Sequence, residues 1–269
     1  MRYVLTFILT ALLSAVSSHA QELTILHMND THSHIDPQRS GTYAGRGGVI
    51  EQAVYIDSVR TVEGRRNVLL FHAGDFGQGT SYFTQLNGDV EIDVMNAHKF
   101  DVVCLGNHEF DNGVDELARR LADLDAEVVC SNYDFSSSPL EKHVKPYVIV
   151  RRAGLKIGIF GLLTDIAKVV DKSIADAFEY HDPAEVANRY AAFLRNEKKC
   201  DLVICLSHLG YEEDKELASA VRNLDLIVGG HSHTLLHKKQ LVRNPDGKDV
   251  VVVQNWKWGL NIGHLSVKY

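Results

Sequence analysis

The sequence predicts a mixed α/β protein with two mixed sheets that pack on each other and are covered by helices. Two observations lead to this fold class. In much of the chain, apolar runs of strand length alternate with segments that are apolar at helical spacing, as in parallel strands joined by helices. Elsewhere two strand-like runs are joined by a short turn, which indicates antiparallel hairpins. Two packed sheets accommodate both kinds of connection.

The first half of the chain is predicted to alternate strands with helices. The expected strands are the apolar runs 23–26, 68–71, 101–105 and 126–130. Between them, apolar residues recur every three or four positions, as they do in helices that pack one face on a sheet. The expected helices are residues 48–60, 90–97 and 114–124.

The second half is predicted to contain hairpins as well as crossovers. Residues 147–152 and 156–160 flank the turn Ala153-Gly154-Leu155, and Asn244-Pro245-Asp246-Gly247 forms a second turn signal. One clear helix is expected at 183–198, with Asp182 as its cap and Pro183 in its first turn. The other expected strands are 202–206, 225–228, 239–242, 250–254 and 262–269.

Residues 1–20 have the organisation of a secretory signal peptide. Arg2 precedes a long apolar run, and the small residues Ser18 and Ala20 stand before the expected cleavage site. A membrane anchor is the alternative, but the run is shorter than the roughly 20 apolar residues that a spanning helix needs. We therefore expect an exported protein, periplasmic or secreted and without a membrane anchor, in which residues 21–269 form one domain.

Composition argues against a nucleic-acid-binding surface and against a thiolate zinc site. The formal net charge is −7 and there is no basic run, which argues against a nucleic-acid partner because such binding requires Lys and Arg to neutralise phosphates. Cys104, Cys130 and Cys205 lie in or beside apolar strand-like runs, where a thiol behaves as a small buried hydrophobe. We expect these thiols and Cys200 to be free, and the absence of a CxxC pair disfavours a thiolate zinc site.

The stretch Gly-Asn-His-Glu-Phe-Asp at 106–111 directly follows the expected strand 101–105. An amide, an imidazole and two carboxylates are costly at the end of a buried strand unless they are hydrated, paired or bound to a cation. One interpretation is an ordinary polar turn, in which Asp111 or Asn112 caps the helix that starts near Val114. The other interpretation is a ligand site.

The same arrangement recurs after four other expected strands, which favours the ligand site. Ligands of open α/β sheets bind at the carboxyl ends of the strands, so these side chains are expected to converge. The residues that follow the strands beginning at 23, 68, 202 and 225 are, in order, Asp30 and His32, Asp75, His208, and His231 and His233.

Carboxylate and amide oxygens combined with imidazole suit zinc, manganese, iron, nickel or cobalt without selecting between them. One ion is expected on Asp30, His32, Asp75 and either His231 or His233. A second is expected on Asp75, Asn107, His208 and the other histidine. A shared carboxylate would hold the ions roughly 3.5–4 Å apart, the spacing that clamps the attacking and leaving oxygens in phosphoryl transfer. A water bridging both ions would supply hydroxide near neutral pH.

His108 is adjacent to an expected ligand, so its ring is predicted to face the substrate instead of the metals. As an imidazolium it could stabilise charge on the phosphoryl oxygens or protonate the leaving group. Asp111, three residues later, is placed to accept a hydrogen bond from the other ring nitrogen and so to fix the tautomer.

In this order, the segments Asp30-x-His32, Gly74-Asp75, Gly106-Asn107-His108-Glu109, His208 and Gly230-His231-x-His233 resemble the motif set of the calcineurin-like metallophosphoesterases. Residues 27–32, 78–80, 107–111 and 230–234 are similar, more narrowly, to the catalytic domain of the secreted 5'-nucleotidases, which include bacterial UDP-sugar hydrolases. The resemblance covers residues 22–269. It implies a four-layer α/β/β/α sandwich, His233 at the first metal, His231 at the second, and a catalytic dyad of His108 and Asp111.

The resemblance implies a phosphoric ester hydrolase whose expected substrates are 5'-nucleotides. Diester or pyrophosphate bonds, in cyclic nucleotides or UDP-sugars, are the alternative. Family members usually continue into a second domain that stacks the nucleobase and supplies arginines, and this chain ends where that linker would begin. A separate specificity polypeptide is therefore one expected partner, and without it the chain could be inactive on nucleotides. The segment Gly45-Arg46-Gly47-Gly48 also departs from the family's Gly-Gly-x-x-Arg order.

Overall fold

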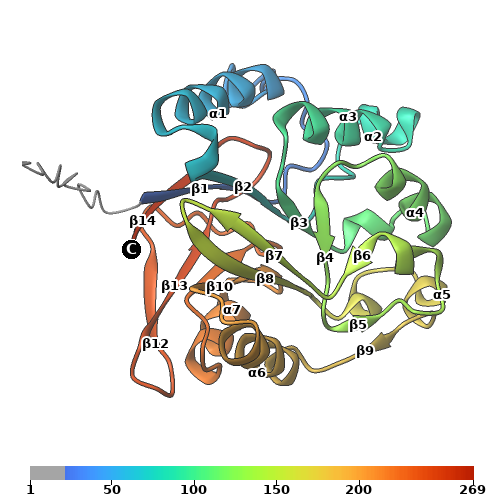
Figure 1. Cartoon of the computed structure of the whole chain (residues 1–269). Coiled ribbons are helices and arrows are strands. Elements are labelled where there is room, and N and C mark those ends of the chain that lie inside the picture. The colour runs from blue at the N-terminus through green and yellow to red at the C-terminus, as the bar shows by residue number, and fades with distance from the viewer. Residues whose placement is uncertain (1–21) are drawn as a thin grey trace, which may run out of the picture.

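The computed structural model describes residues 22–269, which form two six-stranded sheets packed face to face between layers of helices (Figure 1). The predicted mixed α/β class and the four-layer arrangement are confirmed. The signal peptide expected at residues 1–20 lies outside the described residues.

The first sheet has the strand order β14-β1-β2-β3-β4-β6. Its strands run parallel, except that β14 is antiparallel to β1. The bounds are β1 (Glu22–Met28), β2 (Val68–Ala73), β3 (Val102–Cys104), β4 (Glu127–Val129), β6 (Val144–Lys145) and β14 (Gly263–Lys268).

The second sheet has the order β12-β13-β11-β10-β8-β7. Its four central strands are parallel, whereas β7 and β12 form antiparallel pairs at the two edges, as the two predicted turns require. A separate two-stranded ribbon pairs β5 (Tyr133–Asp134) with β9 (Glu179–Tyr180). The bounds are β7 (Tyr147–Arg152), β8 (Leu155–Leu163), β10 (Leu202–His208), β11 (Leu226–Gly229), β12 (Gln240–Arg243) and β13 (Asp249–Gln254).

Helices cover the outer faces of both sheets (Figure 1). The first sheet is covered by α1 (Val49–Glu63), α3 (Asp89–His98) and α4 (Val114–Ala122), and the second by α6 (Pro183–Ala192) and α7 (Tyr211–Ala220). As predicted, Asp182 caps α6: its carboxylate accepts a hydrogen bond from the Glu185 amide at 2.9 Å. Among residues 22–269, no helix is both long and apolar enough to cross a membrane.

The apolar residues form three layers because both faces of each sheet are buried. On β2, Leu69 and Phe71 face the other sheet and pack with residues such as Ile157 and Ile204, while Leu70 faces the helices. A strand buried on both faces needs apolar residues at every position, so its sequence is a continuous apolar run. All four cysteines are buried and free, as expected.

Several short elements differ from the expectation. Helices α2 (Ser81–Leu86), α5 (Lys172–Ala175) and α7 were not predicted, nor were β5, β6 and β9. The polar-turn interpretation of residues 106–111, in which Asp111 or Asn112 caps α4, is wrong: the helix does start at Val114, but its N-cap is Gly113 and no side chain caps it. The Asp111 carboxylate is instead paired with His108.

Candidate metal centre

The loops that follow β1, β2, β3, β10 and β11 bring the predicted ligands together. Parallel strands of both sheets end at this edge of the molecule, so side chains far apart in the sequence become neighbours. Two groups of three possible ligands result, one formed by Asp30, His32 and His233 and the other by Asp75, His208 and His231.

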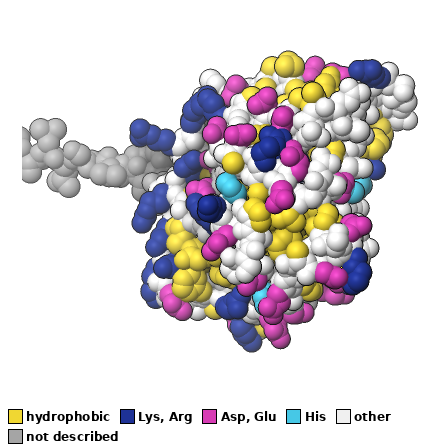
Figure 2. All heavy atoms as spheres, turned by 90° about the vertical axis from the view of Figure 1, so that its right-hand side faces the viewer, with side chains coloured by type: hydrophobic (Ala, Val, Ile, Leu, Met, Phe, Trp, Pro, Cys, Tyr) yellow, Lys and Arg dark blue, Asp and Glu magenta, His cyan; other side chains and the backbone are white. Residues whose placement is uncertain are grey.

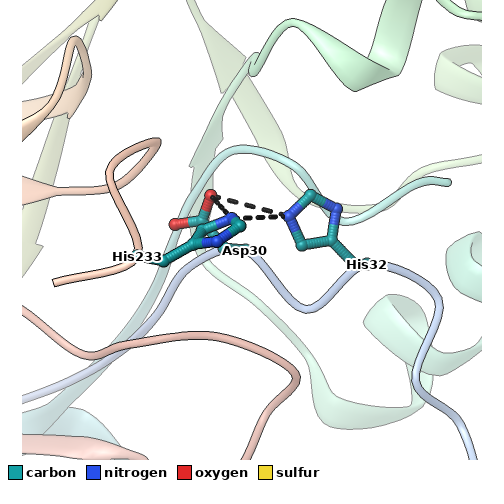
Figure 3. A group of neighbouring side chains, drawn as sticks. All are labelled: Asp30, His32 and His233. Carbon is teal, nitrogen blue, oxygen red and sulfur yellow. Dashed lines mark hydrogen bonds and ion pairs between the residues drawn. The ribbon is translucent and has the colours of Figure 1, made fainter. Parts of the chain in front are cut away.

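In the first group, the three side chains point toward one another (Figure 3). The Nε2 atoms of His32 and His233 are 2.9 Å apart. Asp30 Oδ1 lies 3.4 Å from His233 Nε2 and 3.9 Å from His32 Nε2. The carboxylate and both imidazoles therefore face one small space, and Asp30 is fully buried.

The second group is buried like the first, with two buried residues and one that is half-buried. His208 is fully buried, and its Nε2 lies 3.1 Å from Asp75 Oδ2. Its other ring nitrogen is 2.7 Å from the Ala73 carbonyl, so Nδ1 carries the proton in that bond and Nε2 faces the carboxylate. The ring of His231 meets that of His208 edge-on, with 5.1 Å between the centroids.

Asp75 connects the two groups. Its Oδ2 atom, 3.1 Å from His208 Nε2, is also 3.9 Å from His32 Nε2 in the first group. Its Oδ1 atom accepts a hydrogen bond from the His108 amide at 2.9 Å. Gly106 packs directly on this carboxylate, since a Cβ there would lie 2.2 Å from Asp75 Oδ1. Asn107, between these two neighbours, is brought beside Asp75.

The residues present fit divalent cations. All the donors are oxygen or imidazole nitrogen, and the amide oxygen of Asn107 is buried without a hydrogen-bond partner among residues 22–269. Burial opposes ionisation of Asp75, yet His208 holds its carboxyl pKa well below the usual range. Burial likewise lowers the pKa of His208, but Asp75 and Asp30 raise it to about 10. This negative field, which favours a proton on His208, equally favours a bound cation.

Most of the predicted ligands have a left-handed backbone, which non-glycine residues rarely adopt. Such conformations cost of the order of 1–3 kcal/mol each and cluster at functional sites. The surrounding structure must therefore hold these loops in place. The residues and their φ angles are Asp30 (51°), His32 (47°), Asp75 (56°), His231 (73°) and His233 (51°).

Glu109 provides part of this support, a role that was not predicted from the sequence. Its fully buried carboxylate accepts hydrogen bonds from the amides of Asp75 at 2.8 Å and Gly106 at 2.6 Å. It also accepts bonds from the amides of Phe76 and Gly77. One side chain thus ties the loop after β2 to the loop after β3, and its position inside the 106–111 motif was the available signal.

His108 and Asp111 form the expected pair beside the first group. His108 Nδ1 lies 2.9 Å from Asp111 Oδ2, and the His108 ring is 5.4 Å from that of His32. The His108 side chain is 32% exposed, so its other nitrogen is reachable. The hydrogen bond to Asp111 raises the pKa of His108 to about 8, which keeps the ring cationic at pH 7.

Comparison with known proteins identifies the family of the chain. The sequence profile of the family described as calcineurin-like phosphoesterase matches residues 23–235. The chain belongs to this family. Among relatives of this calcineurin-like phosphoesterase, the probable 5'-nucleotidase of Treponema pallidum is 34% identical over 268 residues, covering 92% of this chain and 45% of the relative. The NAD 5'-nucleotidase of Haemophilus influenzae is 34% identical over 272 residues, covering 93% and 45%.

Solved structures give the same result for the fold. The 5'-nucleotidase precursor of Thermus thermophilus superposes with a TM-score of 0.85 at 37% identity, covering 92% of this chain and 51% of that one. This calcineurin-like phosphoesterase therefore spans about half the length of these relatives. Family and geometry together indicate divalent metals in the centre.

Trp256 and Trp258 lie against the centre of this phosphoesterase. The Trp258 amide donates to the Asp30 carbonyl at 2.7 Å, and the Asn29 side-chain amide donates to the Trp256 carbonyl at 2.6 Å. The Trp258 ring stacks on His34, with centroids 4.8 Å apart. The loop that carries both tryptophans therefore braces the backbone of a predicted ligand.

Proposed function

We propose that this chain hydrolyses phosphate monoesters, with 5'-nucleotides as substrates and two divalent cations in the centre. The observation that carries the proposal is the placement of Asp75, whose Oδ2 atom faces His208 in one group and His32 in the other. Two relatives named 5'-nucleotidases support the choice of substrate.

The proposed ligands divide as the geometry groups them. Asp30, His32 and His233 would serve the first ion, and Asp75, His208 and His231 the second. We assign Asp75 to both ions because its Oδ2 also faces His32, and Asn107 to the second because its amide oxygen has no partner among residues 22–269. When bound, two such cations polarise phosphoryl oxygens and lower the pKa of water.

His108 and Asp111 act on the substrate in this proposal. The cationic ring of His108 donates a hydrogen bond to a phosphoryl oxygen or a proton to the leaving oxygen. Asp111 accepts the hydrogen bond from Nδ1–H of the cationic ring at 2.9 Å, which orients the ring and leaves Nε2–H as the donor to the substrate.

Phosphate release from AMP tests the proposal. The chain is stripped with a chelator and assayed before and after manganese or zinc is restored, beside Asp75→Ala. We expect metal-dependent release that the substitution abolishes. Metal binding without cleavage of AMP or of an aryl phosphate would refute the proposal.

A pyrophosphate bond is the second candidate, because one relative is named an NAD 5'-nucleotidase. Release of AMP from NAD or of UMP from a UDP-sugar, faster than phosphate from AMP, would favour it. The comparison of AMP with an aryl phosphate also tests the proposed separate specificity polypeptide. Selective cleavage of AMP by this chain alone would show that such a partner is not needed.

We also propose export of the chain, on the basis of the signal pattern at residues 1–20. Cleavage after Ala20 in the mature protein, read by N-terminal sequencing, tests it.

A further inference from the structure

A small cavity of about 30 Å³ lies behind the metal centre, between α3, β2 and the loop after β1. Much of its wall is apolar, including Met28, Phe76 and Met95. Six polar residues also line it: Thr31, Ser33, His34, His72, Glu91 and His98. None of these polar residues belongs to the groups of predicted ligands.

Of these residues, Glu91 is the one whose burial costs the most free energy. It is only 3% exposed, and neither carboxylate oxygen has a hydrogen-bond partner within residues 22–269. A buried carboxylate without a partner costs several kcal/mol, so native proteins pair such groups or bind water to them.

His72 also lacks a hydrogen-bond partner, at one of its two ring nitrogens. It is 1% exposed; its Nε2 lies 3.1 Å from the Thr31 hydroxyl, but its Nδ1 has no partner in the described part of the chain. Burial lowers the pKa of His72 to about 3, so the ring is neutral and needs one donor and one acceptor. The hydroxyl meets only one of these needs.

We propose that an ordered water in this cavity bridges the Glu91 carboxylate to Nδ1 of His72, and that this chain of bonds positions Thr31. The cavity exceeds the about 10–15 Å³ that one water requires, and both Glu91 and His72 line it. The water donates one hydrogen bond to the Glu91 carboxylate and forms a second hydrogen bond with Nδ1 of His72.

The chain of bonds reaches the metal centre through Thr31. This residue separates Asp30 from His32, both of which have positive φ angles. Holding the Thr31 hydroxyl from behind therefore fixes the strained loop that carries two proposed ligands. This consequence for metal affinity rests on the proposed function; the water bridge itself does not.

A direct pair between Glu91 and Arg120 is the competing arrangement. Arg120 is 1% exposed, and its Nη1 has no partner among the described residues, while its Nη2 donates to the Glu109 carbonyl at 2.7 Å. If Glu91 turned to Arg120, it would leave His72 unpaired.

Two measurements on the full chain test the bridge. A high-resolution crystal structure is expected to show water between Glu91 and His72; a dry cavity, or Glu91 paired with Arg120, overturns the inference. Zinc affinity is then measured by chelator competition for Glu91→Leu, His72→Phe and the double variant. Each single substitution should weaken binding about 10–100-fold, as losses of groups that orient ligands do.

The double variant should bind zinc no more weakly than the worse single variant, because both substitutions break one chain of bonds. Additive losses would overturn the inference. Asp93→Asn, an exposed carboxylate on the same helix, is the matched control and should bind like the wild type. Absence of zinc binding by the wild type would instead refute the proposed function, and the crystal structure would still decide whether the water is present.

Discussion

At the scale of single residues, His108 differs from the proposed ligands because its ring lies at the surface of the centre and is paired with Asp111. We predict that His108→Gln lowers kcat by about 10²–10⁴-fold, the usual contribution of a general acid. Asp111→Asn should have a smaller effect, because it removes only the group that orients the ring and keeps it cationic.

Steady-state kinetics on AMP, with metal content measured on the same samples, check this prediction. Metal content should be unchanged in both variants, since neither side chain is a proposed ligand. Loss of bound metal in His108→Gln would show that this ring serves the cations.

Asp214 is a second residue for which we make a prediction, because its burial makes the stability of the fold depend on pH. It is fully buried, accepts a hydrogen bond from the Ser207 hydroxyl through Oδ1, and has no partner at Oδ2 within the chain from 22 to 269. Burial raises the pKa of Asp214 to about 8; Glu213 adds to the rise and His208 opposes it. Folding therefore favours the protonated acid.

The sign of the pH dependence follows from that shift. The stabilising contribution is complete below the unfolded pKa near 4 and is lost as pH rises through about 8. Each pKa unit is worth about 1.4 kcal/mol, so the loss is of the order of several kcal/mol. Denaturant unfolding from pH 5 to 9 in chelator should show this slope, and Asp214→Asn should reduce it; the raised pKa of His208 leaves a residual slope in both proteins. An equal slope in both proteins would show that Asp214 does not titrate in this range.

At the scale of elements, the short strands β2 and β3 are held together beyond their ends by Glu109. Its carboxylate accepts four backbone amide bonds from the two loops. We predict that Glu109→Ala destabilises the fold by about 2–4 kcal/mol, because buried amides lose their acceptor. Urea unfolding measures this change.

Asp115→Ala is the control for Glu109→Ala, since Asp115 is an exposed carboxylate in the first turn of α4. It should unfold close to the wild type. If Glu109→Ala matched that control, the carboxylate would not be what joins the loops.

The elements that the sequence predicted share a strong apolar pattern. Residues 68–71 and 202–206 belong to strands that are buried on both faces. Each run is therefore apolar at nearly every position, and a buried strand can be predicted from the sequence. Helix α7 was missed because few of its buried positions are large apolar residues; its buried side chains are Asp214, Leu217 and Ala218. Helix α2 has six residues, too few to show a helical period.

The candidate site was more predictable than those short elements, because each predicted ligand lies at the end of a strand or within a few residues after it. Sequence could not show which histidine joins which group without the family resemblance, since His231 and His233 are two residues apart. It also did not show the contacts of Glu109 with the amides of both loops, because these depend on distances that only the packed layers define.

At the scale of the whole molecule, the four layers place the carboxyl ends of two parallel sets of strands at one edge. This arrangement lets Asp75 from the first sheet meet His208 from the second. On the face shown in Figure 2, acidic side chains are spread between apolar patches.

The central claim is that two cations share Asp75. Anomalous diffraction from crystals of the chain loaded with manganese or zinc tests it most directly. We predict two peaks about 3.5–4 Å apart, with the Asp75 carboxylate between them. One peak near Asp30, His32 and His233 is expected, and the other near His208 and His231. A single peak, or two peaks without Asp75 between them, would contradict the account.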